Sequence, residues 1–214
     1  MLTVQTFTFN PVQENTYIVY NEKGDCCIID PGCYFASEEQ TLTKFIGDNH
    51  LKPLYLLNTH CHLDHIFGNR FISKTYNLSL SINKLEKPVL DYGPASGQLW
   101  QLPFDNYDGE LIFLSENDTI SLGSDKLKVL FTPGHSPGSI SFYSQEYKFV
   151  ISGDVLFQGS VGRTDLPGAD FKVLENSIKT KLYTLPPDVT VYSGHGDSTT
   201  IGYEMETNPF VTIK

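Results

Sequence analysis

The stretch Thr59-His60-Cys61-His62-Leu63-Asp64-His65 places three imidazoles and one carboxylate within six residues. The apolar run Leu54-Tyr55-Leu56-Leu57 precedes it, separated from it only by Asn58. This run predicts a buried strand that ends at the histidines. The chain contains six histidines, so half of them lie in this one stretch. Imidazole nitrogens and carboxylate oxygens are common metal ligands in proteins. The stretch therefore predicts a metal site at the end of a strand.

Three further strand-like runs end in glycine followed by a residue that can bind a metal. They are Leu127–His135, Lys148–Asp154 and Val189–His195. Glycine has no Cβ, so it allows a positive φ at the turn and a close approach of the backbone to the site. If these strands and the one at 54–57 share a sheet edge, their carboxyl ends bring seven side chains to one cleft. These side chains are His60, His62, Asp64, His65, His135, Asp154 and His195.

Seven ligands exceed what one tetrahedral ion uses, so we expect two divalent metal ions. A mixture of imidazole and carboxylate suits zinc, with iron or manganese as alternatives. Cys61 lies between two of the histidines, and in an extended segment its side chain points to the opposite face, so we predict that it packs in the core. His50 ends a predicted helix, where partial positive charge suits the helix dipole, and we assign it a structural role.

Apolar periodicity and turn residues predict a mixed α/β chain. The predicted strands span residues 2–9, 16–20, 26–29, 54–57, 78–82, 111–114, 119–122, 126–131, 140–143, 148–151 and 189–192. Predicted helices span about 37–50, 64–76 and 170–182. Ser37 with Gln40 matches a capping box for the first helix, and Asp170 can cap the last.

The segment from Lys84 to Glu110 contains three prolines and three glycines that interrupt every regular pattern. It also contains aromatic residues, which a plain linker would lack. We predict an ordered loop region, which either forms a wall of the substrate site or packs on the core through its aromatics.

Composition and charge narrow the class of protein. The 214 residues are enough for one substantial core, and no linker is evident, so we predict a single domain over 1–214. With 15 basic and 25 acidic residues the formal charge is −10, which argues against a nucleic-acid partner. The chain shows no signal peptide and no run of about 18 apolar residues. Its four cysteines lack C-x-x-C spacing. We expect a cytoplasmic protein without a membrane partner and leave its oligomeric state open.

The motifs together resemble the metallo-β-lactamase-fold hydrolases along the whole chain. The resemblance rests on the stretch 60–65 followed by Gly134-His135, Gly153-Asp154 and Gly194-His195, and it extends to Asn15-Thr16-Tyr17, Asp30-Pro31-Gly32 and Asn208-Pro209-Phe210. It implies an αββα sandwich of two mixed β-sheets flanked by helices, with the site at the sandwich edge. It also implies a division of the ligands, with His60, His62 and His135 on one metal, Asp64, His65 and His195 on the other, and Asp154 bridging them.

Within that family the segment Gly162-Arg163-Thr164-Asp165-Leu166-Pro167-Gly168 is similar to glyoxalase-II-like thioester hydrolases, in particular short bacterial ones. This likeness implies hydrolysis of a small S-2-hydroxyacyl thioester, such as lactoylglutathione, by a hydroxide held between the two metals. Asp64 and Asp154 would orient that nucleophile. Arg163 would bind the substrate carboxylate, or alternatively form a surface pair with Asp165 or Asp170. The acyl group and the thiol carrier stay open.

Other functions fit parts of the pattern. An iron-dependent persulfide dioxygenase of the same fold would hold one iron with the residues matching His60, His135 and Asp154. β-Lactamases of the fold lack the equivalent of either His65 or Asp154, so the presence of both counts against antibiotic hydrolysis. Gly134–Gly138 matches the G-x-S-x-G motif of serine hydrolases, but the residue after the serine is proline, which has no N–H for an oxyanion hole. A non-catalytic metal-binding module is the remaining alternative.

Overall fold

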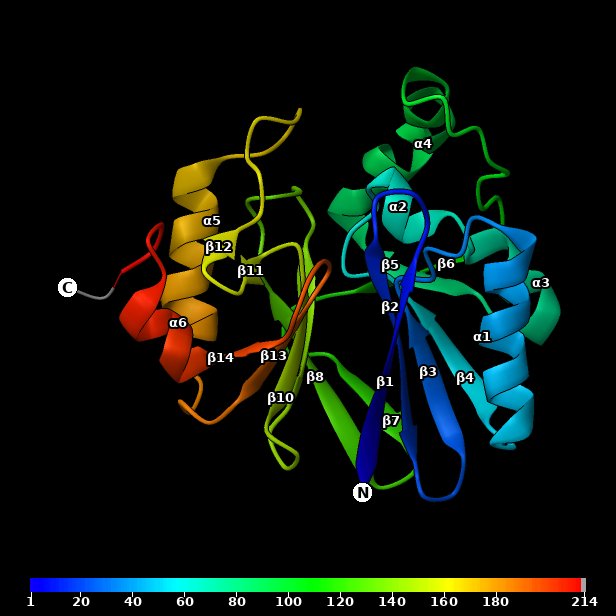
Figure 1. The fold of residues 1–214 in the computed structure, drawn as a ribbon, viewed down its shortest axis with the longest axis horizontal. Coiled ribbons are helices and arrows are strands. Elements are labelled where there is room, and N and C mark those ends of the chain that lie inside the picture. The colour runs from blue at the N-terminus through cyan, green and yellow to red at the C-terminus, as the bar shows by residue number, and fades with distance from the viewer. Residues whose placement is uncertain (213–214) are drawn as a thin grey trace.

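Two six-stranded β-sheets are stacked face to face in the computed structural model, which describes residues 1–212 (Figure 1). The first sheet has the order β1 to β6, with bounds Leu2–Phe9, Glu14–Asn21, Asp25–Ile29, Lys52–Leu57, Leu80–Asn83 and Leu111–Leu114. The second sheet has the order β14, β13, β10, β9, β8, β7, with bounds Thr199–Thr200, Thr190–Ser193, Phe149–Gly153, Ile140–Ser144, Asp125–Phe131 and Thr119–Leu122. A small hairpin pairs β11 (Leu156–Phe157) with β12 (Ser160–Val161).

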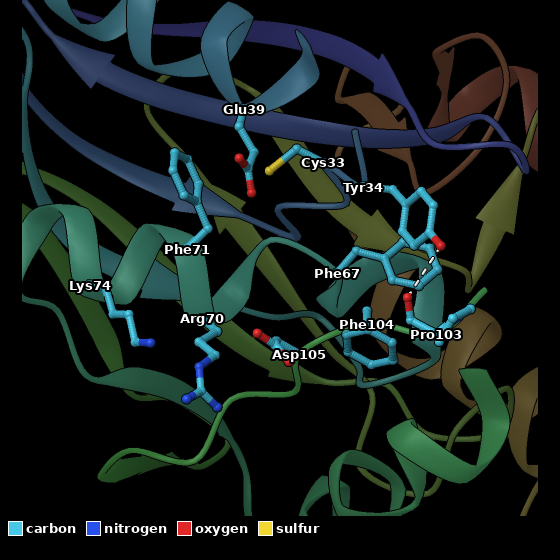
Figure 2. A pocket seen from close by; sticks show the side chains of 10 residues that line it. All are labelled: Cys33, Tyr34, Glu39, Phe67, Arg70, Phe71, Lys74, Pro103, Phe104 and Asp105. Atoms are coloured by element: carbon cyan, nitrogen blue, oxygen red, sulfur yellow. Dashed lines mark hydrogen bonds between the residues drawn. The ribbon is translucent and has the colours of Figure 1, made fainter. Parts of the chain in front are cut away.

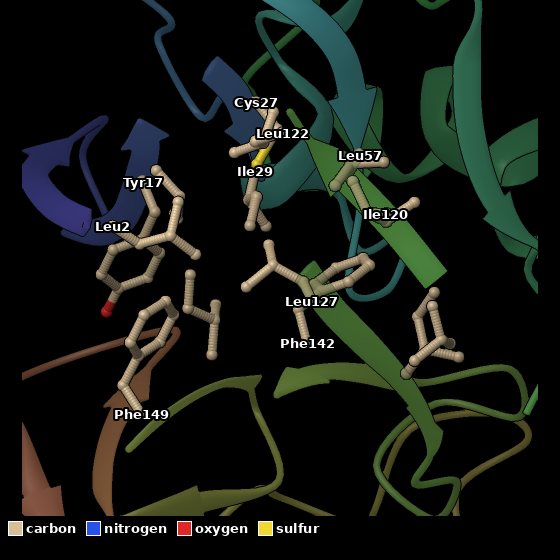
Figure 3. Packing of buried hydrophobic residues seen from close by; sticks show 14 of the residues in the cluster. Leu2, Tyr17, Cys27, Ile29, Leu57, Ile120, Leu122, Leu127, Phe142 and Phe149 are labelled. Carbon is tan, nitrogen blue, oxygen red and sulfur yellow. The ribbon is translucent and has the colours of Figure 1, made fainter. Parts of the chain in front are cut away.

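Three apolar clusters hold these layers together. The central one lies between the sheets and joins side chains such as Tyr17 and Ile29 of the first sheet to Phe142 and Ile151 of the second (Figure 3). The outer face of the first sheet is covered by α1 (Ala36–Asp48), α2 (Leu63–Ile66), α3 (Asn69–Tyr76) and α4 (Lys87–Leu99). The outer face of the second is covered by α5 (Phe171–Ser177), its π-helical continuation Ile178–Leu182, and α6 (Ile201–Thr207). The predicted αββα sandwich is confirmed.

Strand direction explains why the ligand-type residues meet. β10 is parallel to β13, and β9 is antiparallel to both β8 and β10, so β8, β10 and β13 end at the same edge of the second sheet. β3 and β4 are parallel in the first sheet and end beside them. The prediction that all four ligand-bearing strands share one sheet edge is wrong, because β4 belongs to the first sheet. The site therefore lies where the edges of two sheets meet.

Hydrogen bonds join the two sheets at that edge. Asn15 N donates to the Gly194 carbonyl over 2.7 Å, and Ile140 N donates to the Thr59 carbonyl over 2.9 Å. The buried hydroxyl of Tyr17 donates to the Ser193 carbonyl over 2.5 Å. These bonds hold the strand ends in register across the sandwich, because a buried backbone carbonyl without a donor would be costly.

The segment 84–110 is not a loop throughout, because residues 84–86 form a 3₁₀ turn and Lys87–Leu99 form α4. Pro94 removes the N–H that would bond the Leu90 carbonyl, but Asn106 Nδ2 donates to that carbonyl instead, over 2.7 Å. Gly93 permits close packing, since a Cβ there would lie 3.0 Å from Ile66 Cδ1. The prolines and glycines are thus tolerated through tertiary contacts that sequence periodicity does not report.

Two further helix predictions needed correction. α1 begins at Ala36, and the Glu38 carboxylate accepts from the Tyr34 and Phe35 amides over 2.8 and 3.0 Å, so the Ser37–Gln40 capping box is wrong. The helix predicted over 64–76 is divided into α2 and α3. The Asp170 cap is confirmed by bonds from the amides of Lys172 and Val173. Within residues 1–212, every helix is too short or too polar to cross a membrane.

Candidate metal centre

The segment after β4 is held extended by bonds to its backbone. Thr59 N donates to the Asp30 carboxylate over 2.7 Å, and Cys61 N donates to Glu86 Oε2 over 2.7 Å. An extended backbone sends alternate side chains to opposite faces. His60 and His62 therefore face the strand ends, while Cys61 is buried in the apolar cluster outside the first sheet, as predicted.

Three histidines form the first ligand group. One nitrogen from each of His60, His62 and His135 lies within 4.8 Å of the others. His62 Nδ1 and His135 Nε2 are 2.8 Å apart. The first two histidines follow β4 and the third follows β8, so this group joins the two sheets.

A second group forms beside the first from Asp64, His65 and His195, whose ligand atoms also lie within 4.8 Å of one another. His195 Nε2 is 3.1 Å from Asp64 Oδ2, and His65 Nε2 is 3.7 Å from the same oxygen. The rings of His60 and His65 have centroids 4.1 Å apart, so the two groups adjoin.

Asp154 lies between the groups. Its Oδ1 is 3.5 Å from His65 Nε2, and its Oδ2 is 3.5 Å from His135 Nε2 and 3.7 Å from His195 Nε2. One carboxylate thus faces histidines of both groups. The structure brings all seven residues selected from the sequence into one constellation.

Backbone carbonyls orient two of the histidines from behind. His135 Nδ1 lies 2.7 Å from the Arg163 carbonyl, and His195 Nδ1 lies 3.2 Å from the Gln13 carbonyl. A carbonyl can only accept, so each Nδ1 carries a proton and each Nε2 is the atom that can offer a lone pair to a metal. Such a second hydrogen bond is the usual support of a metal-binding histidine.

Asp30 supports His65 in the same way, although in the sequence it stood out only through the family resemblance of Asp30-Pro31-Gly32. The carboxylate is buried and accepts from Thr59 N and Oγ1 over 2.7 and 2.6 Å and from Asn58 Nδ2 over 3.1 Å, and His65 Nδ1 lies 3.1 Å from it. The sequence did contain a feature that could have marked Asp30: it directly follows β3, as the other candidate ligands follow their strands. Glu14, also buried, has its Oε1 3.7 Å from the same His65 nitrogen, and no sequence pattern marked it.

Buried polar atoms without partners test whether a metal fits. His60 Nε2, His65 Nε2 and Asp154 Oδ1 are buried and make no hydrogen bond within the described part of the chain. A buried polar atom left without a partner costs about 1–3 kcal/mol. All three belong to the same constellation, and imidazole with carboxylate is a suitable donor set for zinc, iron or manganese. The residues therefore fit bound divalent cations.

Burial and charge set the protonation of the two groups differently. Burial, aided by neighbouring histidines, holds the pKa of His60 well below its ordinary value and lowers the pKa of His62 to about 3. Burial also opposes charge on His65, but the charges of Asp64 and Asp154 outweigh it and raise the pKa of His65 well above its ordinary value. At neutral pH His60 and His62 are thus ready to bind a cation, whereas His65 and His195, whose pKa values are raised by the neighbouring carboxylates, must first release a proton.

Arg163 contributes its backbone to the centre, but its side chain faces another residue. The side chain is 52% exposed, and its Nε and Nη2 donate to the Asp165 carboxylate over 2.7 and 2.8 Å. Of the alternatives that the sequence left open, the surface pair with Asp165 is the arrangement observed. A substrate carboxylate would have to replace Asp165 on this guanidinium.

A cleft of about 430 Å³ lies beside the segment that follows His65 (Figure 2). It is lined by Cys33, Tyr34, Glu39, Phe67, Arg70, Phe71, Lys74, Pro103, Phe104 and Asp105. Across it, the Tyr34 hydroxyl donates to the Pro103 carbonyl over 3.2 Å. None of the seven predicted ligands is among the lining residues, so this cleft is separate from the constellation.

Ser136 is unsuited to act as a nucleophile. Its side chain is fully buried, and its hydroxyl donates to Glu86 Oε1 over 2.6 Å. An activated serine instead needs a neighbouring base and access to substrate. This contact removes the remaining support for a serine hydrolase.

Residues 9–195 match the family model described as the metallo-beta-lactamase superfamily. The chain belongs to the metallo-β-lactamase superfamily. Its members are generally metal-dependent hydrolases. The chain is also 34% identical, over 215 residues and the full length of both proteins, to "Hydroxyacylglutathione hydrolase GloC" of Haemophilus influenzae.

Solved structures of the superfamily show the same architecture. The chain is similar to the BLEG-1 B3 metallo-beta-lactamase, with a TM-score of 0.90 and 37% identity over 99% of this chain and 100% of that one. It is also similar to TTHA1623 in a di-iron-bound form, with a TM-score of 0.88 and 38% identity over 97% of this chain and 100% of that one. These neighbours support metal binding by the His/Asp constellation and leave the identity of the metal open.

Proposed function

We propose that the protein hydrolyses thioesters of small 2-hydroxy acids, such as lactoylglutathione, with two divalent metal ions held by the seven-residue constellation. The observation that carries the proposal is that Asp154 faces histidines of both ligand groups, within 3.5–3.7 Å. Similarity to a hydroxyacylglutathione hydrolase over the full length of both chains supports the substrate class. We further propose zinc as the resident metal, with iron and manganese as alternatives.

The chain's own residues have distinct tasks in this proposal. His60, His62 and His135 would hold one cation, and Asp64, His65 and His195 the other, with Asp154 shared. When bound, two such cations supply Lewis acidity, which lowers the pKa of water and polarises an acyl carbonyl. Asp64 and Asp154 accept hydrogen bonds from the attacking water and orient it toward the acyl carbon.

The supporting contacts keep those residues in the required protonation state. The carbonyls of Arg163 and Gln13 accept from Nδ1 of His135 and His195, which leaves both Nε2 atoms to bind the metal. Asp30 has the same task for His65. Because Ser136 is buried and hydrogen-bonded, the proposed reaction uses water as the nucleophile and forms no acyl-enzyme on this serine.

Arg163 is our proposed anchor for a substrate carboxylate. The planar guanidinium binds a carboxylate through two parallel hydrogen bonds, and Asp165 occupies it in that manner. Arg163→Ala should raise KM for a carboxylate-bearing thioester about tenfold and leave kcat nearly unchanged. Asp165→Asn frees the guanidinium and should lower KM, and an unchanged KM in both variants would exclude Arg163 as the anchor.

Metal content and hydrolysis, measured on the same preparation, test the proposed function. Protein purified without added metal should contain two divalent ions per chain and hydrolyse a 2-hydroxyacyl thioester, and a chelator should remove both properties. One iron per chain, with oxygen uptake on glutathione persulfide and no thioester hydrolysis, would instead establish the dioxygenase alternative.

β-Lactam hydrolysis is the second candidate, because the chain is 37% identical to the BLEG-1 B3 metallo-beta-lactamase over nearly its whole length. Attack of water on a lactam carbonyl needs the same constellation, so metal content cannot separate the two activities. A chromogenic cephalosporin in the same assay can do so. A kcat/KM for the cephalosporin above that for every thioester tested would replace the proposed substrate class.

A further inference from the structure

Glu86 is a buried carboxylate that none of the proposed steps uses. Its side chain is fully buried at the start of α4. Oε2 accepts from Cys61 N over 2.7 Å, and Oε1 accepts from Ser136 Oγ and from Gly138 N, each over 2.6 Å. Burial raises the pKa of Glu86, and the hydrogen bonds from these three donors oppose that rise.

The three donors lie beside the histidines of the first ligand group. Cys61 separates His60 from His62, and Ser136 directly follows His135. The first pair follows a strand of the first sheet and His135 follows a strand of the second. One carboxylate therefore connects the two segments that must meet for three imidazoles to share an ion.

We propose that Glu86 is a positioning residue that sets the spacing of His60 and His62 relative to His135 and thereby the affinity of this group for a metal. The inference rests on the metal-binding part of the proposed function, and it does not depend on the substrate.

The local sequence around the second segment is built for this contact. Pro137 has no N–H, so the donors that reach Oε1 come from the residues on either side of it. A Cβ on Gly138 would lie 2.7 Å from Glu86 N and 2.9 Å from its Cγ, so only glycine lets the loop approach this closely. The segment 136–138 is thus fitted to a carboxylate at position 86. The amide of a glutamine at that position would turn an N–H toward at least one of the three donors.

The test is a titration of the metal-free Glu86→Gln protein with cobalt in the presence of a competing chelator, in which binding is monitored by visible absorption. Because partners behind metal ligands typically contribute 10- to 100-fold to metal affinity, we expect one of the two equivalents to bind about 10- to 100-fold more weakly. The absorption bands of that equivalent should also change, since they report the coordination geometry. The other equivalent should keep its affinity.

Glu204→Gln is the matched control. Glu204 is also fully buried, and it accepts from Thr199 Oγ1, Asn208 Nδ2 and Gly159 N over 2.6, 2.8 and 3.0 Å. None of these donors adjoins a histidine of the first group. This variant should lose comparable stability in thermal unfolding while it retains both cobalt affinities and the wild-type spectrum.

Ser136→Ala removes only one of the three donors, so it keeps the inference testable if Glu86→Gln does not fold. A several-fold weaker binding of the same equivalent is expected. Wild-type cobalt binding in Ser136→Ala and Glu86→Gln, or an equal loss in Glu204→Gln, would overturn the positioning role. A protein that shows the expected cobalt losses but hydrolyses no thioester would refute only the proposed function.

Discussion

Asp30→Asn isolates the contribution of the carboxylate behind His65. Asp30 has a φ of 49°, in the left-handed region, which asparagine also tolerates, so the substitution adds no backbone strain. Thr59 N and Asn58 Nδ2 both donate to Oδ1, which keeps an amide oxygen at that position. The amide nitrogen then replaces Oδ2, 3.1 Å from His65 Nδ1.

An amide N–H at this place can only donate to the imidazole. His65 must then carry its proton on Nε2, the atom that faces Asp64 and Asp154. A protonated nitrogen cannot bind a metal. The variant also loses the hydrogen bonds that His65 Nδ1 and Thr59 Oγ1 donate to Oδ2, and each hydrogen bond to a charged group contributes about 1.5–3 kcal/mol. At about 1.4 kcal/mol per factor of ten, the affinity of the second ligand group should fall about 10- to 100-fold.

Chelator competition on the metal-free protein at neutral pH measures this effect. The second equivalent should weaken more than the first, because Asp30 contacts His65 directly and reaches His60 only through Thr59 Oγ1. Glu204→Gln again serves as the control for a general loss of stability. The reasoning fails if both equivalents keep wild-type affinity, or if both weaken to the same extent.

Three other predictions concern the second ligand group. His195→Ala should remove one metal equivalent and most hydrolytic activity, and full activity in this variant, as measured by thioester turnover, would exclude the dinuclear mechanism. Gly194→Ala places a Cβ 2.0 Å from Asp154 Oδ1 and 2.8 Å from His65 Cε1. Thermal unfolding should therefore show a loss of about 1–3 kcal/mol in the free energy of unfolding, and metal analysis should show one equivalent fewer. A drop in pH from about 7 to about 5.5 should weaken the second equivalent more than the first, because the raised pKa values of His65 and His195 make protons compete there. In the first group, burial holds the pKa of His60 low and lowers that of His62 to about 3. Equal weakening of both equivalents in a pH series of titrations would contradict this assignment.

The elements of the site were predictable because they are local in sequence. A strand followed by glycine and a ligand residue can be recognised within seven residues, as in Lys148–Asp154. The structure places each such residue at the constellation, although the sharing of one sheet edge was wrong. Although β4 belongs to the other sheet, Ile140 N donates to the Thr59 carbonyl over 2.9 Å, so the segment after β4 lies against the second sheet and the residues still meet.

The errors arose where a distant residue compensates for an unfavourable local one. Pro94 should end a helix, but the Asn106 side chain replaces the missing donor to the Leu90 carbonyl, and α4 continues. Ser37 with Gln40 has the pattern of a capping box, but Glu38 accepts the amides of the preceding turn and also that of Asn10, 28 residues away. Local propensity is a weak guide wherever a tertiary hydrogen bond is available.

Residue type and spacing were enough to select seven candidate ligands and the superfamily, because ligand chemistry is a property of individual side chains and short motifs. The supports of those ligands were decided only by the tertiary structure. Asp30 reaches His65 across 35 residues of sequence, and Glu86 reaches Ser136 across 50. A hydrogen bond between segments so far apart leaves no periodic pattern, since its geometry exists only after the two sheets have packed. In our proposal these supports set how firmly each half of the centre holds a metal.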